Sequence, residues 1–141
     1  MKVLILLLML LPITAQCATL DCPGIATYVY AVGQGGRTVG QCIDADGVGH
    51  GFMHTDKAGY VIIDYPNSQW SALYGVSNGK VIGTFLDSSG HYHGYTYDRG
   101  MFTTLEYPGA VNTYATGIDS GGDVAGYYEG IDGKIHGFFI K

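Results

Sequence analysis

The stretch at residues 78–102 reads NGKVIGTFLDSSGHYHGYTYDRGMF and decides the fold. Turn signals at 78–79, 87–90 and 98–100 separate short runs that are rich in β-branched and aromatic residues. Such turns are typical of antiparallel hairpins, because glycine adopts positive φ angles without steric cost and aromatic residues suit strands. The pattern predicts four strands, near 74–77, 81–86, 92–97 and 101–107.

The same pattern recurs along the chain with a period of about 43 residues. Three markers share this register. Triplets of the form His-Gly-aromatic begin at His50, His93 and His136; glycines recur at Gly40, Gly83 and Gly126; prolines recur at Pro23, Pro66 and Pro108. A four-stranded meander of this length has the size of one β-propeller blade. We therefore expect an all-β domain over 18–141, with three units at about 20–62, 63–104 and 105–141.

The composition agrees with a strand-rich fold. Of 141 residues, 23 are Gly and 12 are Tyr, while only 4 are Pro. There is no Gly-X-Y triplet, which excludes collagen, and the aromatic content is too high for a disordered chain.

The number of units leaves the closure of the fold open. Three units are fewer than the four blades of a closed propeller, and the third unit reaches Lys141 just after its third strand. The segment 19–22 matches the end of a fourth strand, so either this segment or a partner chain would complete the last unit. We expect propeller-like blades in an open half-ring or a homo-oligomer; a β-trefoil is the alternative.

One further pattern resembles a known family. The chain carries Asp98-Arg99-Gly100-Met101-Phe102, then 106–110 (EYPGA), Gly117-Ile118-Asp119, Gly126-Tyr127 and His136-Gly137-Phe138. This order resembles the bacterial extracellular repeats named HAF, over about 20–141. The resemblance implies secretion and a propeller-like β architecture, and it transfers no catalytic residues. The first unit departs from it, since Cys22 replaces the aromatic residue before Pro23.

Residues 1–17 are typical of a secretory signal peptide. Lys2 precedes the unbroken apolar run 3–11, and small residues follow near the cleavage site expected at 15–18. Nine apolar residues are about half of what a bilayer span requires, so we expect no transmembrane anchor. The predicted location is secreted or periplasmic; lipid attachment at Cys17 is the alternative.

The number of cysteines in the mature chain, and therefore their pairing, depends on the cleavage site. Cleavage after Cys17 leaves Cys22 and Cys42 in an oxidising compartment, which predicts a disulfide between them. The alternatives are two free thiols or, if Cys17 survives, a Cys17–Cys22 bridge. The basic residues outside the leader are scattered singly, which argues against nucleic acid as a partner: Arg37, Lys57, Lys80, Arg99, Lys134 and Lys141.

We expect no catalytic residue, metal or cofactor. Ser77 lies in a G-x-S-x-G match at 75–79, but that motif needs a following helix, and 81–85 reads as a strand. The repeated histidines are expected to bond to backbone or hydroxyl groups within their own units. Asp44-Ala45-Asp46-Gly47 resembles the start of a calcium loop, yet turn chemistry explains it equally in all three units.

The aromatic side chains offer the candidate ligand-binding residues Trp70, Tyr74 and Tyr114. Flat amphipathic rings provide contact area at low entropic cost, but we favour the interpretation that alternate aromatic residues fill the core between units. Trp70, after Pro66, is expected in a surface loop. The function predicted is a secreted, non-catalytic β module for protein or cell-envelope interaction; the alternative is a small lectin-like carbohydrate-binding protein.

Overall fold

The computed structural model describes residues 18–141. The predicted signal peptide at 1–17, its cleavage site and Cys17 lie outside the described residues. Across the described part, no helix is long and apolar enough to cross a membrane.

The chain forms three antiparallel sheets, which confirms the all-β prediction. The first sheet contains β1 (Ala26–Val32), β2 (Thr38–Ile43), β3 (Gly49–Thr55) and β4 (Gly59–Ile62); the second contains β5 (Trp70–Ser77), β6 (Lys80–Leu86), β7 (Tyr92–Asp98) and β8 (Met101–Leu105); the third contains β9 (Ala110–Ile118), β10 (Val124–Gly130) and β11 (Ile135–Ile140). A short 3-10 turn, η1 (Gln34–Gly36), joins β1 to β2. In every sheet the strands pair in chain order.

The turns predicted from the sequence form the hairpins. Asn78 and Gly79 both have positive φ, 50° and 84°, as a two-residue hairpin between β5 and β6 requires. The boundary at β5 differs from the prediction, since pairing with β6 already begins at Trp70, opposite Leu86. Trp70 is therefore a half-buried strand residue and does not lie in a surface loop.

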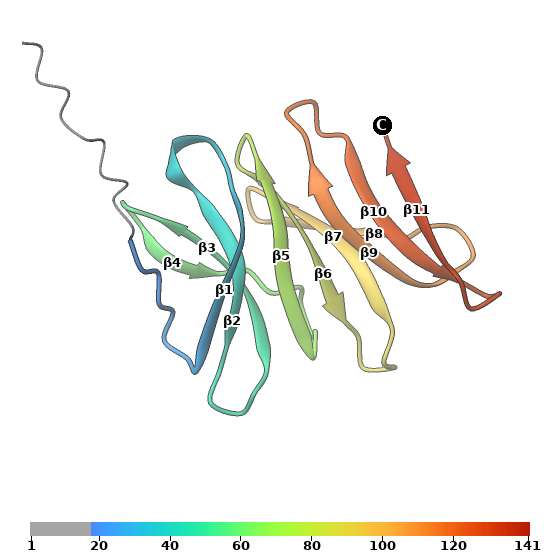
Figure 1. Cartoon of the computed structure of the whole chain (residues 1–141), viewed down its shortest axis with the longest axis horizontal. Coiled ribbons are helices and arrows are strands. Elements are labelled where there is room, and N and C mark those ends of the chain that lie inside the picture. The colour runs from blue at the N-terminus through green and yellow to red at the C-terminus, as the bar shows by residue number, and fades with distance from the viewer. Residues whose placement is uncertain (1–17) are drawn as a thin grey trace, which may run out of the picture.

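The three sheets stack face to face in a row (Figure 1). Strand β5 packs against the first sheet and β9 packs against the second, so the middle sheet is covered on both faces. None of the described sheets closes on itself, which excludes the barrel of a β-trefoil. The first sheet and β11 lie at opposite ends of the row, so segment 19–22 does not complete the third sheet within this chain.

Two apolar layers hold the stack together. Between the first and second sheets, the buried side chains are Val39, Ile63, Leu73, Val76, Val81, Phe85 and Tyr95. Between the second and third sheets, they are Ile82, Ala115 and Val124, with Phe138 packed beside them. Tyr95 also makes hydrogen bonds within the first of these layers. Its hydroxyl donates to the Ile63 carbonyl oxygen at 2.9 Å and bonds to the Ser71 hydroxyl at 2.9 Å.

The predicted Cys22–Cys42 disulfide is confirmed. Its position is informative, because residues one period further along form aromatic stacks. Tyr65 lies on Phe85 with ring centroids 3.9 Å apart, and Tyr107 lies on Tyr128 at the same distance. The disulfide thus replaces, in the first sheet, the stacked ring pair of the other two.

Candidate functional site: a tyrosine row beside histidine–carboxylate clusters

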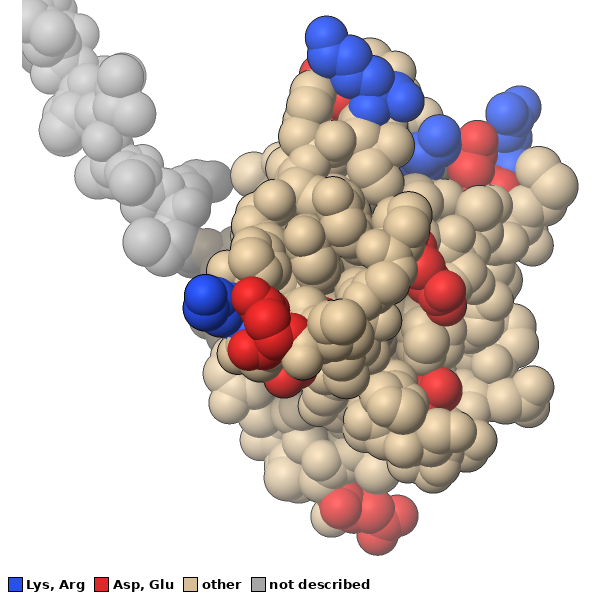
Figure 2. All heavy atoms as spheres, turned by 90° about the vertical axis from the view of Figure 1, so that its right-hand side faces the viewer, with Lys and Arg blue, Asp and Glu red and all other residues tan. Residues whose placement is uncertain are grey.

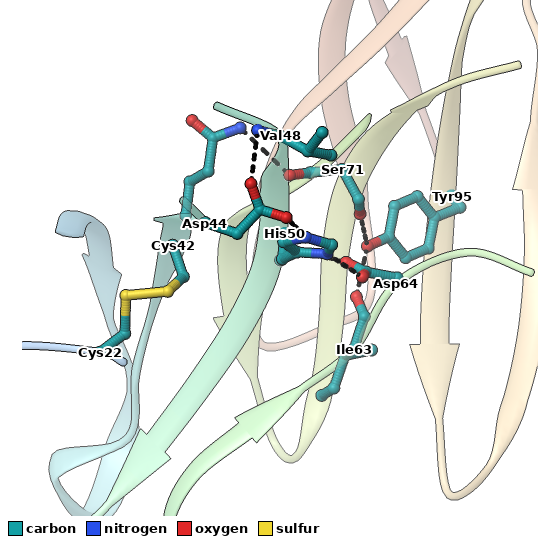
Figure 3. Close-up of polar contacts among 11 residues, drawn as sticks. Cys22, Cys42, Asp44, Val48, His50, Ile63, Asp64, Ser71 and Tyr95 are labelled. Carbon is teal, nitrogen blue, oxygen red and sulfur yellow. Dashed lines mark hydrogen bonds and ion pairs between the residues drawn. A yellow bond between two sulfur atoms is a disulfide. The ribbon is translucent and has the colours of Figure 1, made fainter. Parts of the chain in front are cut away.

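His50 on β3 is held by two carboxylates (Figure 3). Its Nδ1 lies 2.6 Å from an Asp64 oxygen, and its Nε2 lies 3.1 Å from an Asp44 oxygen. The second oxygen of Asp64 accepts a hydrogen bond from the Gly51 N–H. Asp64 therefore holds the segment that follows β4 against β3. The hydrogen bond to Asp64, followed by that to Asp44, raises the pKa of His50 against the opposing effect of burial.

His93 on β7 has the same arrangement. Its Nδ1 lies 2.9 Å from a Glu106 oxygen, and its Nε2 lies 3.0 Å from an Asp87 oxygen. The backbone N–H of His91, and then the His93 side chain, lower the pKa of Asp87 to about 2.

His136 on β11 has half of this arrangement. Its Nε2 lies 3.4 Å from an Asp132 oxygen, and in the described part of the chain no fourth strand supplies a carboxylate to Nδ1. The expectation of backbone or hydroxyl partners for these histidines is therefore wrong, because acidic side chains bind them. The sequence held a signal for this: each of Asp64 and Glu106 stands two residues before a proline of the repeat.

These clusters fit a structural role better than a catalytic one. Both ring nitrogens of His50 and of His93 face carboxylates, so neither ring offers a free nitrogen to take a proton from a substrate or to bind a metal. Among residues 18–141, no three His, Cys, Asp or Glu side chains come together as metal ligands. Asp44 Oδ1 accepts from the backbone N–H groups of Asp46 and Val48, which is turn chemistry.

Ser77 is the last residue of β5. A hairpin turn and strand β6 follow it, where a nucleophile elbow has a helix. The G-x-S-x-G match is therefore part of a hairpin.

A cavity of about 420 Å³ opens beside His50. Its lining residues are Pro23, Cys42, Asp44, His50, Tyr60, Ile62 and Asp64. The matching place in the second sheet is filled by Tyr65, which stacks on Phe85. Cys42, which lines the cavity, stands one period before Phe85, so the first sheet has no ring stack at this place.

Two groups of aromatic rings lie along the three sheets, and the phenols of the second group act on the pKa of Tyr74 in the first; together we call them the tyrosine row. Tyr30 stacks on Tyr74 at 4.9 Å and lies 6.4 Å from Tyr28. Tyr114 lies 5.2 Å from Tyr92 and 4.6 Å from Tyr127, and Trp70 meets Tyr92 edge-on. The predicted residues Trp70, Tyr74 and Tyr114 all belong to this row, each half-buried.

Three members of the row are exposed: Tyr28 is 50%, Tyr30 43% and Tyr127 40% accessible. Burial, and then the neighbouring phenols, raise the pKa of Tyr74 to about 12. Its hydroxyl is consequently neutral at physiological pH and both donates and accepts hydrogen bonds. The row thus combines flat apolar faces with neutral polar groups.

Several other rings pack in the layer between the first and second sheets, as the favoured interpretation of the aromatic residues expected. Tyr65 and Phe85 contact Tyr95 and Phe102 in the layer between the first and second sheets. Tyr107 and Tyr128 stack near Phe138 in the third sheet but lie outside its buried layer, since Tyr107 is 37% exposed. The sequence alone does not separate these rings from the row, because both sets alternate along strands in the same way.

Comparisons with protein-family models, with curated proteins and with solved structures found no match for this chain.

Proposed function

We propose that this chain is an exported, non-catalytic β module whose sheets act as propeller-like blades and whose tyrosine row binds a protein or cell-envelope partner. The observation that carries the proposal is the row itself. Tyr30 on β1 and Tyr74 on β5 place stacked rings from two sheets side by side, and Tyr30 and its neighbour Tyr28 are exposed.

Tyrosines in this arrangement suit recognition. Each ring offers a large contact area with few rotatable bonds, and its hydroxyl supplies a hydrogen bond at the edge of an apolar face. Stacking on a neighbour fixes the orientation of Tyr30 before any partner arrives, which reduces the entropy lost on binding. Charge does not direct this contact, since the row consists of neutral side chains.

Export and family membership are part of the proposal. Disulfides persist in oxidising compartments outside the cytosol, and the Cys22–Cys42 bond agrees with the predicted signal peptide. The motif order at 98–138 supports membership among HAF-type repeat proteins.

The binding role is tested with a variant in which Tyr30→Ala and Tyr74→Ala are combined. The exported chain is immobilised and exposed to a cell-envelope extract of its own organism, and bound proteins are quantified by mass spectrometry. We expect one protein enriched on the unmodified chain and lost from the double variant. Tyr97→Ala is the matched control, since Tyr97 lies beside Phe102 in the core layer and outside the row. Equal enrichment on all three chains would refute the proposal.

Carbohydrate binding is the second candidate, and the exposed ring faces of Tyr28, Tyr30 and Tyr127 favour it. Sugar rings stack on such faces while hydroxyl groups bond to the phenols. A glycan array separates the two candidates: binding that disappears with Tyr30→Ala and Tyr74→Ala supports a lectin, and silence on the array combined with a captured protein supports the first role.

A further inference from the structure

The open face of the third sheet carries a glycine whose neighbour is missing. A Cβ atom on Gly51 would come within 3.1 Å of Leu73, and one on Gly94 within 2.9 Å of Ala115. In both cases the next sheet of the stack is too close for a side chain. Gly137 holds the same position of the repeat, yet a Cβ there would meet nothing nearer than 4.0 Å. A further sheet, packed as the next sheet packs on Gly51 and Gly94, would occupy the space above Gly137.

A second glycine repeats this observation. A Cβ on Gly75 would lie 3.3 Å from Ile118 of the next sheet, whereas its counterpart Gly117 has no atom within 4 Å. The apolar side chains of this face agree. Phe139 is 60% exposed, while its counterpart Met53 packs against the core between the first two sheets. Figure 2 looks onto this end of the stack and shows a largely uncharged surface, with most basic side chains along its upper margin.

The opposite end of the stack carries the complementary side chains. Val29 occupies the position of Leu73 and Ala115, the residues that cover Gly51 and Gly94. Both counterparts are fully buried, but Val29 is 49% exposed. Val32 is 71% exposed, whereas its counterpart Val76 is 9% exposed. The outer face of the first sheet is therefore built to cover a preceding sheet.

The charged residues at the two ends match as well. Asp21 stands two residues before Pro23, as Asp64 and Glu106 stand before their prolines. Each of those acids binds the histidine of one sheet while the next residue packs on the following sheet. Cys22 already packs on the first sheet through its disulfide, so Asp21 belongs with the sheet that would precede it. Within residues 18–141, His136 is the repeated histidine that has no such acid at Nδ1.

We propose that a second copy of this chain covers both open faces, head to tail. Val29 of one copy packs on Gly137 of the other, segment 19–21 runs along β11 as its fourth strand, and Asp21 bonds His136 Nδ1. A second copy is the occupant that these observations specify, because the two faces of one chain complement each other in shape and in charge. Two copies make six sheets, within the four to eight of closed propellers, whereas three copies exceed that range.

Cysteine cross-linking tests the contact directly. Chains carrying Val29→Cys and chains carrying Gly137→Cys are purified separately, mixed and oxidised mildly. We expect a disulfide-linked dimer in the mixture and none from either chain alone. Ser88→Cys, in an exposed turn, replaces Val29→Cys in the control mixture. Cross-linking of the control to the same extent, or none in the first mixture, overturns the proposal.

Charge variants test the same contact without any added cysteine. Asp21→Arg is expected to weaken self-association about tenfold, and His136→Glu combined with it to restore association, because the ion pair is reversed. Asp46→Arg, in an exposed turn, is the matched control and should leave association unchanged. Sedimentation velocity measures all three. Association that is equal in Asp21→Arg and in the control contradicts the assigned contact.

Discussion

Cys22 and Cys42 hold together the same two positions that a pair of stacked rings joins in each of the other sheets. The covalent bond makes up for the lost ring contact, because it restricts the unfolded chain over a sequence separation of 20 residues. Cys42 of this bond also lines the cavity beside His50.

Replacing both cysteines with alanine should destabilise the domain by about 3 kcal/mol. Without the disulfide, the unfolded chain gains conformational entropy, and for a loop of this length the gain lowers its free energy by that amount. Cys22→Tyr with Cys42→Phe should recover part of the loss, because it rebuilds the Tyr65–Phe85 stack in the first sheet. Urea unfolding measures both. Equal stability of the two double variants would show that the positions are not interchangeable.

The pKa of His50 is raised in the folded protein, chiefly by Asp64. Its stabilising effect is therefore complete below the ordinary value of 6.5 and is lost as the pH rises through the folded pKa. Asp64→Asn should lower the pKa of His50, as followed by NMR titration of the ring protons, while Asp56→Asn, in an exposed turn, serves as the control. An unchanged His50 pKa in Asp64→Asn would contradict the assigned pair.

The pKa of the acid Asp87 is shifted in the opposite direction to that of His50. The pKa of Asp87 falls from 3.8 to about 2, so its contribution is present above pH 3.8 and is lost as the pH falls toward 2. We expect Asp87→Asn to reduce stability at pH 7 and to have a much smaller effect near pH 2, where about half of the Asp87 carboxyl groups are protonated. Thermal unfolding at both pH values measures this, and a loss of equal size at each pH would contradict it.

Among the elements, Tyr95 on β7 links two sheets by hydrogen bonds as well as by packing. Tyr95→Phe leaves the Ile63 carbonyl and the Ser71 hydroxyl without this buried partner and should cost about 1–3 kcal/mol. Tyr97→Phe is the control, since no side-chain hydrogen bond of Tyr97 occurs within the described residues. Chemical denaturation distinguishes them. Equal stability of the two variants would mean that the hydrogen bonds do not join the sheets.

The sequence predicted the elements where turns are marked chemically. Asn78-Gly79 and the glycines at 90 and 100 position the hairpins of the second sheet, so β6, β7 and β8 begin within one residue of the prediction. The start of β5 was placed four residues too late, although a turn at Pro66 and Asn67 stands shortly before Trp70. Its first residues are fixed by pairing with β6, which is a contact across the sheet that local pattern does not encode.

The candidate site was also predictable only as far as local sequence pattern encodes it. Repeat position identified the three histidines as equivalent, but it did not reveal their partners, because Asp64 is 14 residues from His50 and reaches it from beyond β4. Likewise, Trp70, Tyr74 and Tyr114 were selected as loop aromatics, whereas all three lie on strands and their assembly into one row depends on how the sheets stack.

For the whole molecule, the stack of three sheets has two unlike ends. One presents exposed valines on the first sheet, and the other presents Gly117, Gly137 and His136 on the third. In the closed pair that we propose, self-association would cover the edge of β11 that no described strand pairs, and this edge would otherwise be a site for aggregation.

The measurement that tests this most directly is the mass of the unmodified exported chain by sedimentation equilibrium at pH 7. We expect twice the mass of one chain over the micromolar range, with no larger species, since two copies leave no open face. A single-chain mass throughout that range, or a series of growing polymers, would contradict the closed pair.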